Sequence, residues 1–168
     1  MKIMKKYVLL VILSAVAVQL SFAQTADTLT TSFVKNATMG NLMEIKTGQL
    51  AVKKGQSARV KAFGAQMVKD HSLANAQLKK IAIKKKYSTT VAPIIISPML
   101  ANESGGEFDK NYTMMMIADH QKTVDLFEKV ANNSTDAEIK AFAAKLLPKL
   151  KQHLATVESI SRSLQVSK

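Results

Sequence analysis

Three histidines are the residues of this chain best suited to chemistry. Two of them, His71 and His120, end the same short motif, in which an aromatic residue, a methionine and an aspartate precede the histidine at matching distances. The motif occupies residues 63–71 and again residues 112–120, and the third histidine is His153. A neutral imidazole is the commonest metal ligand in proteins. The residue types therefore direct attention first to metal binding.

Helical spacing places each histidine on an apolar stripe. Residues recurring every three or four positions are apolar from Phe63 to Ile81, from Met116 to Val130 and from Phe142 to Leu164. A further stripe, from Phe33 to Ala51, carries a glutamate among small residues. Because such stripes face the core of a helical protein, four side chains able to bind metal are predicted to point inward: Glu44, His71, His120 and His153.

These four residues predict a buried site for zinc, copper or iron, which imidazole and carboxylate ligands suit. Asp70 and Asp119 are predicted outer-shell acceptors that orient the rings. Adjacent residues on a helix do not face each other, so each aspartate is expected to serve a histidine of a neighbouring helix. The alternative is a metal-free core in which hydrogen-bonded histidines fix the helix register.

Other catalytic chemistry finds no support. Di-iron bundles carry Glu-x-x-His on two helices, whereas Val68, Ile117 and Leu150 stand three residues before the histidines. Motifs of serine hydrolases, phosphate-binding loops, zinc proteases and EF-hands are absent, and there is no cysteine. The sequence predicts no catalytic residue and favours a binding protein over an enzyme.

Four helices are predicted to position these residues, over residues 30–54, 57–86, 104–131 and 135–164. Gly55 is a typical residue after a helix end. Ser104 with Glu107, and Thr135 with Glu138, form predicted capping boxes. Pro148 is predicted to kink or split the last helix near Leu147.

Loop lengths predict the topology. The first and second helices, and the third and fourth, are joined by a few residues, so each pair forms an antiparallel hairpin. Nearly twenty residues, 87–106, join the hairpins, and the apolar stretch 91–100 is expected to pack on the bundle. One long crossover is the connectivity of ferritin-like four-helix bundles. A plain up-down bundle with a loose middle loop is the alternative.

The N-terminus resembles a secretory signal. Three lysines within residues 1–6 precede an apolar run over 7–20, and Ser21-Phe22-Ala23 follows as a cleavage pattern. We predict a cleaved signal at 1–23, a flexible segment at 24–29 and the bundle domain at 30–165, in the periplasm or secreted. A retained membrane anchor is the alternative, for which this run is short.

Charge bears on partners. Removal of the signal leaves 21 basic and 12 acidic residues, a net charge of +9, which fits anionic components of the cell envelope. A metal-free envelope or stress-protective protein is therefore the alternative function. Nucleic acid is not an expected partner, because the aromatic residues follow apolar stripes or lie in a loop and not between basic residues.

The three segments 33–71, 108–131 and 139–154, with both Asp-His pairs and Leu147-Pro148 ahead of His153, are similar to domain of unknown function 4142. Ile139 is a small departure, where a leucine is usual. The resemblance implies an exported bacterial protein with a ferritin-like bundle, of a kind often labelled outer-membrane or periplasmic. It implies no ligand for the four predicted site residues, since the role of the family is unestablished.

Overall fold

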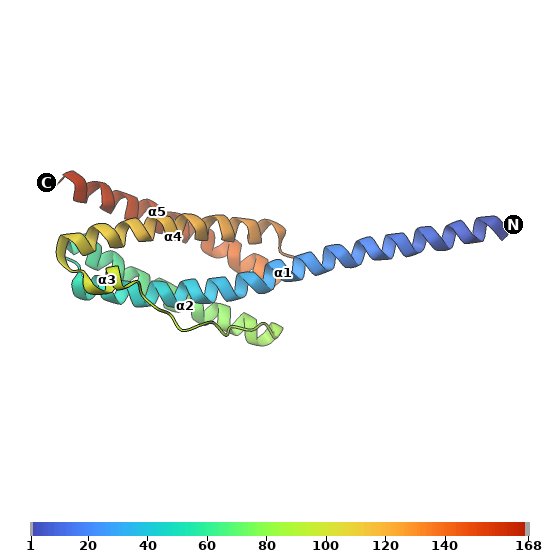
Figure 1. The fold of residues 1–168 in the computed structure, drawn as a ribbon, viewed down its shortest axis with the longest axis horizontal. Coiled ribbons are helices and arrows are strands. Elements are labelled where there is room, and N and C mark those ends of the chain that lie inside the picture. Colours follow the sequence, from blue (N-terminus) through green and yellow to red (C-terminus); the bar gives the residue numbers. More distant parts are fainter. Residues whose placement is uncertain (1, 167–168) are drawn as a thin grey trace.

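The computed structural model describes the backbone of residues 2–166 and the side chains of residues 28–165. This part of the chain contains no strand, and its helices are α1 (Lys2–Lys54), α2 (Ala58–Lys85), α3 (Pro98–Asn102), α4 (Gly105–Asn133) and α5 (Ala137–Val166). The four long helices form a bundle (Figure 1). The predicted all-α, four-helix architecture is therefore confirmed.

The connectivity agrees with the loop lengths. Helices α1 and α2 form one hairpin, α4 and α5 form the other, and the segment containing α3 runs back along the bundle between them (Figure 1). That segment packs down as predicted. Lys46 donates a hydrogen bond to the carbonyl of Ile94 at 3.1 Å, Lys54 donates to the carbonyls of Ala101 and Glu103, and Leu100 is buried.

Helix α1 begins earlier than expected. The sequence predicted a start near Thr30, but α1 runs from Lys2 and its N-terminal part projects beyond the bundle (Figure 1). No proline interrupts residues 2–54, so nothing in the chain forces the helix to stop there. The sequence predicted a signal at 1–23, a flexible segment at 24–29 and a bundle domain at 30–165, and both boundaries between these parts lie inside α1. Cleavage after Ala23 stays a prediction.

Within the part of the chain whose side chains are described, no helix is long and apolar enough to cross a membrane.

The helix caps differ from the predicted boxes. Ser104 precedes α4, but its side chain makes no capping hydrogen bond. Asp136, not Thr135, caps α5, and its carboxylate accepts from the backbone N–H groups of Glu138 at 2.9 Å and Ile139 at 3.2 Å. An aspartate is at least as good as a threonine at this position, and the cap lies one residue later than predicted.

Helix α5 continues through Pro148 without a break. Proline leaves the carbonyl four residues earlier, that of Ala144, without its helical donor. Both Pro148 and Ala144 are exposed, so water can satisfy this carbonyl and the helix need not split as predicted.

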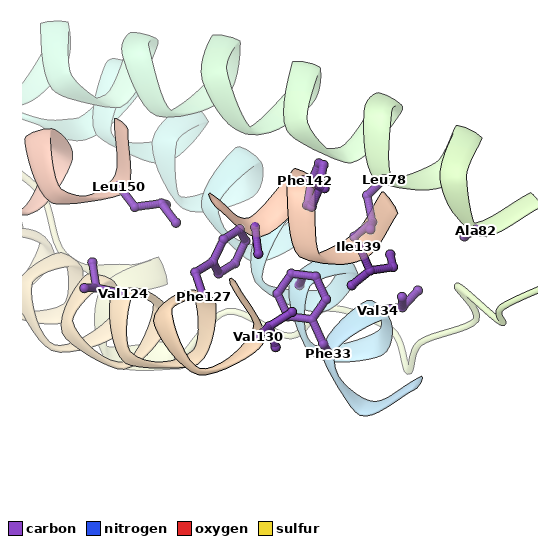
Figure 2. Close-up of a cluster of buried hydrophobic side chains, with 12 residues drawn as sticks. Phe33, Val34, Leu78, Ala82, Val124, Phe127, Val130, Ile139, Phe142 and Leu150 are labelled. Carbon is purple, nitrogen blue, oxygen red and sulfur yellow. The ribbon is translucent and has the colours of Figure 1, made fainter. Parts of the chain in front are cut away.

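Two apolar cores fill the bundle. The first contains an aromatic group in which Phe33 meets Phe127 edge-on with ring centroids 4.9 Å apart, and Figure 2 shows the side chains of all four long helices converging on it. The second contains Phe108 stacked on Tyr112 at 5.6 Å, with Phe63 close by. On each long helix, the predicted ligand lies between the residues that belong to one core and those that belong to the other.

A close contact between α1 and α2 lies beside these positions. A Cβ atom on Gly48 would stand 2.7 Å from the carbonyl oxygen of Gly64, and one on Gly64 would stand 2.7 Å from the Cβ of Ala51. Only glycine fits at both points. The pair fixes how near α1 approaches α2, and so how near the α1 residues come to His71.

Candidate metal centre

The three histidines lie together in the layer between the two cores. His71 comes from α2, His120 from α4 and His153 from α5, and none is more than 6 % exposed. One ring nitrogen of each lies within 4.8 Å of the corresponding nitrogens of the other two. Their ring centroids are 5.5 to 5.9 Å apart. Three of the four predicted ligands are thus brought together.

Each ring is held from outside the group by a hydrogen bond through one nitrogen. His71 Nδ1 donates to the side-chain oxygen of Asn41 at 2.9 Å, and His120 Nδ1 donates to the carbonyl of Met116 at 3.0 Å. His153 Nε2 donates to the carboxylate of Asp70 at 2.9 Å. An acceptor behind the ring fixes which nitrogen carries the proton.

The second nitrogen of each ring has no partner. His71 Nε2, His120 Nε2 and His153 Nδ1 are buried and make no hydrogen bond among the described residues. Because the bonded nitrogen of each ring carries the proton, the other nitrogen carries a lone pair. Three buried lone pairs therefore gather in one layer of the bundle, with no donor to satisfy them.

Burial keeps the histidines neutral. Removal from water, together with the neighbouring histidines, lowers the pKa of His71 to about 3 and that of His120 to about 4. Burial also lowers the pKa of His153, although Asp70 opposes the shift. At neutral pH all three rings are in the uncharged form that binds metal ions.

Glu44, the fourth predicted ligand, lies beside this group and not within it. Its Oε1 is 3.8 Å from His120 Nδ1, the nitrogen already bonded to Met116, and its Oε2 is buried without a partner. Burial, and then the charge of Asp119, raises the pKa of Glu44 to about 8. Its carboxyl group is therefore mostly protonated at neutral pH.

The two predicted outer-shell aspartates occupy different surroundings. Asp70 bonds His153 on α5 and not the adjacent His71, which is the cross-helix pairing expected from helical geometry. Asp119, in the matching motif, makes no hydrogen bond with any of the three histidines, all of which are described. Burial raises the pKa of Asp119 above its ordinary value, although the charge of Lys122 opposes the shift.

A cavity of about 410 Å³ opens beside the histidines, and residues from all four long helices line it. Its wall includes His71, His153 and Glu44. The small residue Gly40 helps to form it, since a Cβ atom placed there would meet nothing within 4 Å. The histidine layer is buried, and this cavity gives it a route to the outside.

Sequence reasoning missed two of the three groups that hold the rings. Asn41 stands three residues before Glu44, on the same helix face, and this spacing was an available signal. The carbonyl of Met116 gave none, because every residue of a helix carries one. Tyr112 was also missed as a polar group: its buried hydroxyl has no partner, and burial, with Glu44 nearby, raises its pKa.

The geometry suits one metal ion on three imidazoles. Bonds of about 2.0 Å to a tetrahedral ion separate the ligand nitrogens by about 3.3 Å. One ring nitrogen of each histidine lies within 4.8 Å of those of the other two, so each pair needs to close by no more than about 1.5 Å. Three protein ligands leave a fourth position open.

Solved structures share the fold. CopM in the Cu(I)-bound form matches with a TM-score of 0.70 at 16% identity, over 80% of this chain and 96% of that one. Its Cu(II)-bound form matches with a TM-score of 0.68 at 14% identity, over 80% and 96%. A DUF305 protein of Streptomyces coelicolor, described as secreted, matches with a TM-score of 0.71 at 7% identity, over 82% and 94%.

The sequence comparisons bear on the family. No curated protein matches the chain. The model of the family described as Domain of unknown function (DUF4142) matches residues 17–160. This range includes the four helix segments that carry the buried histidines and Glu44, and it covers most of the chain. The resemblance noted from the sequence motifs is therefore confirmed, and the chain belongs to the DUF4142 family.

Proposed function

We propose that this protein is an exported metal-binding protein that holds one zinc or copper ion on His71, His120 and His153. The observation that carries the proposal is the set of three buried ring nitrogens without partners. Each such group costs about 1–3 kcal/mol when it stays unsatisfied. A single metal ion in their midst satisfies all three.

The surrounding groups support the same function. Asp70, Asn41 and the Met116 carbonyl each hold the outer nitrogen of one ring, as acceptors behind metal-bound histidines commonly do. They fix which nitrogen of each ring keeps its lone pair before any metal arrives. Glu44 fits a neutral neighbour in the cavity wall better than a fourth ligand, because its carboxyl group is protonated and lies nearest a nitrogen already in use.

Zinc and copper fit the donor set best. Three neutral imidazoles are common ligands of both, whereas iron sites of this kind usually include a carboxylate. CopM, a bundle of the same fold, is known in Cu(I)-bound and Cu(II)-bound forms, which supports the idea that this architecture can carry copper.

The export signal predicted over residues 1–23 supports a location in the periplasm or outside the cell. Its lysines, apolar run and small residues match the pattern that the secretory machinery recognises. A secreted protein is also among the solved structures that share the fold.

Elemental analysis of untagged protein, purified without chelators, tests the function. We expect close to one zinc or copper ion per chain in the parent and none in His71→Ala/His120→Ala. Asp119→Asn should load fully, because the Asp119 side chain makes no hydrogen bond with the three histidines. A folded parent that stays metal-free after equilibration with Zn(II) and, without oxygen, with Cu(I) contradicts the proposal.

One observation favours a second function, binding to the anionic envelope. The outer face of α2 exposes Lys69, Lys80 and Lys84, and two large apolar residues, Leu73 and Ile83, stand among them more than half exposed. Lysines with exposed aliphatic side chains suit an anionic lipid surface.

Vesicle sedimentation tests this second function. We expect the parent to bind vesicles containing phosphatidylglycerol, not pure phosphatidylcholine, and Leu73→Ser/Ile83→Ser to bind less. Ile95→Ser is the control, because Ile95 is more exposed than Leu73 and Ile83 but lies on the crossover segment. Equal loss in the control, or no binding by the parent, contradicts a role for this face.

A further inference from the structure

Two methionines line the cavity that leads to the histidines. Met39 and Met43 lie one turn apart on α1, and both belong to the wall that also contains His71 and His153. Met39 is 45 % exposed, so its side chain reaches solvent. Gly40, between them, leaves open space in the cavity.

These methionines are not core filler. Neither belongs to the two apolar cores, in contrast to Met67 and Met116, which are fully buried in the second core. A large apolar side chain that is nearly half exposed gains little from burial. Met39 is such a side chain, and Met43 is half-buried outside both cores. Core packing therefore accounts for Met67 and Met116 but not for this pair.

The remaining polar groups of the wall do not select a metal by charge. Lys149 Nζ stands 3.9 Å from the carboxylate of Asp70, and Lys122 belongs to the same wall as Asp119. The two lysines offset the two aspartates, and the remaining acid, Glu44, is buried. The wall thus offers little exposed negative charge to draw in a divalent cation, whereas a thioether is a soft, neutral ligand that prefers Cu(I) to Zn(II).

We propose that this cavity is the entry route of the metal site, and that the thioethers of Met39 and Met43 bind Cu(I) and pass it to His71 and His153. The step is an exchange of ligands at a copper ion whose oxidation state does not change. The proposal rests on the proposed function and names its cargo as Cu(I).

Copper transfer to the full mature protein tests the route. Without oxygen, Cu(I) is supplied as its bicinchoninate complex, and the loss of the coloured complex is followed by stopped flow. The test variant is Met39→Leu/Met43→Leu, which keeps the apolar volume. The matched control is Met99→Leu/Met114→Leu, since Met99 and Met114 are 62 % and 56 % exposed and lie outside the wall. Zinc loading is measured on all three proteins.

We expect transfer to the test variant to be at least about tenfold slower, with the control unchanged and zinc loading the same in all three proteins. Parent-like transfer to the test variant, or an equal fall in its zinc loading, overturns the entry route while leaving the histidine site in place. A parent that takes up neither metal overturns the proposed function itself, and the route with it.

Discussion

At the scale of single residues, two aspartate–histidine pairs with the same sequence context have different surroundings. Asp70 holds the ring of His153, whereas Asp119 holds none of the three histidines. The difference arises because each aspartate points away from its own histidine, and only α2 places the aspartate against a histidine of the next helix. Sequence identity of a motif does not make its members equivalent.

This asymmetry gives a paired prediction. Asp70→Asn removes the charge that supports the outer N–H of His153, so we expect zinc affinity to fall by about 10- to 100-fold. Asp119→Asn should change the affinity much less. A competition titration against a coloured chelator measures both variants. Equal losses in the two would show that Asp70 acts through general charge and not through the ring of His153.

Glu44 and the histidines give the metal-free protein opposite pH dependences. In the unfolded chain Glu44 loses its proton near pH 4.5, whereas in the folded protein it keeps the proton up to about pH 8. The free energy of unfolding therefore falls as pH rises through this window. His71 and His120 bind protons in the unfolded chain near pH 6.5 but in the folded protein only near 3 and 4, so stability is lost as pH falls below 6.5.

We therefore expect maximal stability of the metal-free protein near pH 7, with a decline toward pH 8 of at most about 1.4 kcal/mol per pH unit. Urea denaturation in the presence of EDTA measures it. In Glu44→Gln the decline above pH 7 should disappear, while the loss at acid pH remains. A parent whose stability rises from pH 7 to 8 contradicts the buried, protonated carboxyl group.

The histidine positions could be predicted because residue type and the 3.6-residue period together fix which helix face a side chain leaves from. The same reasoning placed Glu44 on the correct face but not its carboxyl group. The direction of a long side chain depends on the groups around it, and the ring nitrogen 3.8 Å from the Glu44 carboxyl group, His120 Nδ1, is already bonded to the Met116 carbonyl. Periodicity carries no information on that.

At the scale of the helices, the contact of α1 with α2 sets the spacing of the site. Gly48→Ala places a methyl group against the backbone carbonyl of Gly64, so the helices must separate. We expect a loss of about 1–3 kcal/mol, despite the better helix propensity of alanine. Gly40→Ala meets open space and should gain up to about 1 kcal/mol. Urea midpoints compare the two, and a change of the same sign in both contradicts the close approach.

The extents of the helices were predictable where the chain carries strong stop signals, such as Gly55. They were not predictable where the outcome depends on competition or exposure. Asp136 displaced Thr135 as the cap of α5, and Pro148 left α5 intact because its face is exposed. The start of α1 depends on residues 2–29, which carry no breaking residue for the sequence to reveal.

At the scale of the whole molecule, a polar layer divides the core. The bundle topology followed from loop lengths alone, since short loops allow only hairpins and one long loop allows a crossover. The division into two cores, and the cavity at their junction, did not follow, because they depend on how small residues such as Gly40 stack against the neighbouring helices.

The layer has a cost in the metal-free protein. Replacing all three histidines, in His71→Leu/His120→Leu/His153→Leu, removes three unsatisfied buried nitrogens and joins the two cores. We expect the variant to be more stable by about 1–4 kcal/mol in EDTA and to bind no zinc or copper. Urea denaturation with and without metal measures both effects. A less stable variant in EDTA would show that the hydrogen bonds behind the rings outweigh the unsatisfied nitrogens.

The same layer affects how the bundle opens. Each core draws on a different stretch of every long helix. We therefore expect the metal-free protein to open as two cooperative units joined by a weak seam, with backbone amides that exchange with solvent at two distinct rates. An ion on α2, α4 and α5 ties both units together across that seam. Metal release then requires the seam to open. The rate at which the slowest amides exchange and the rate at which the ion is released should therefore be limited by the same opening event.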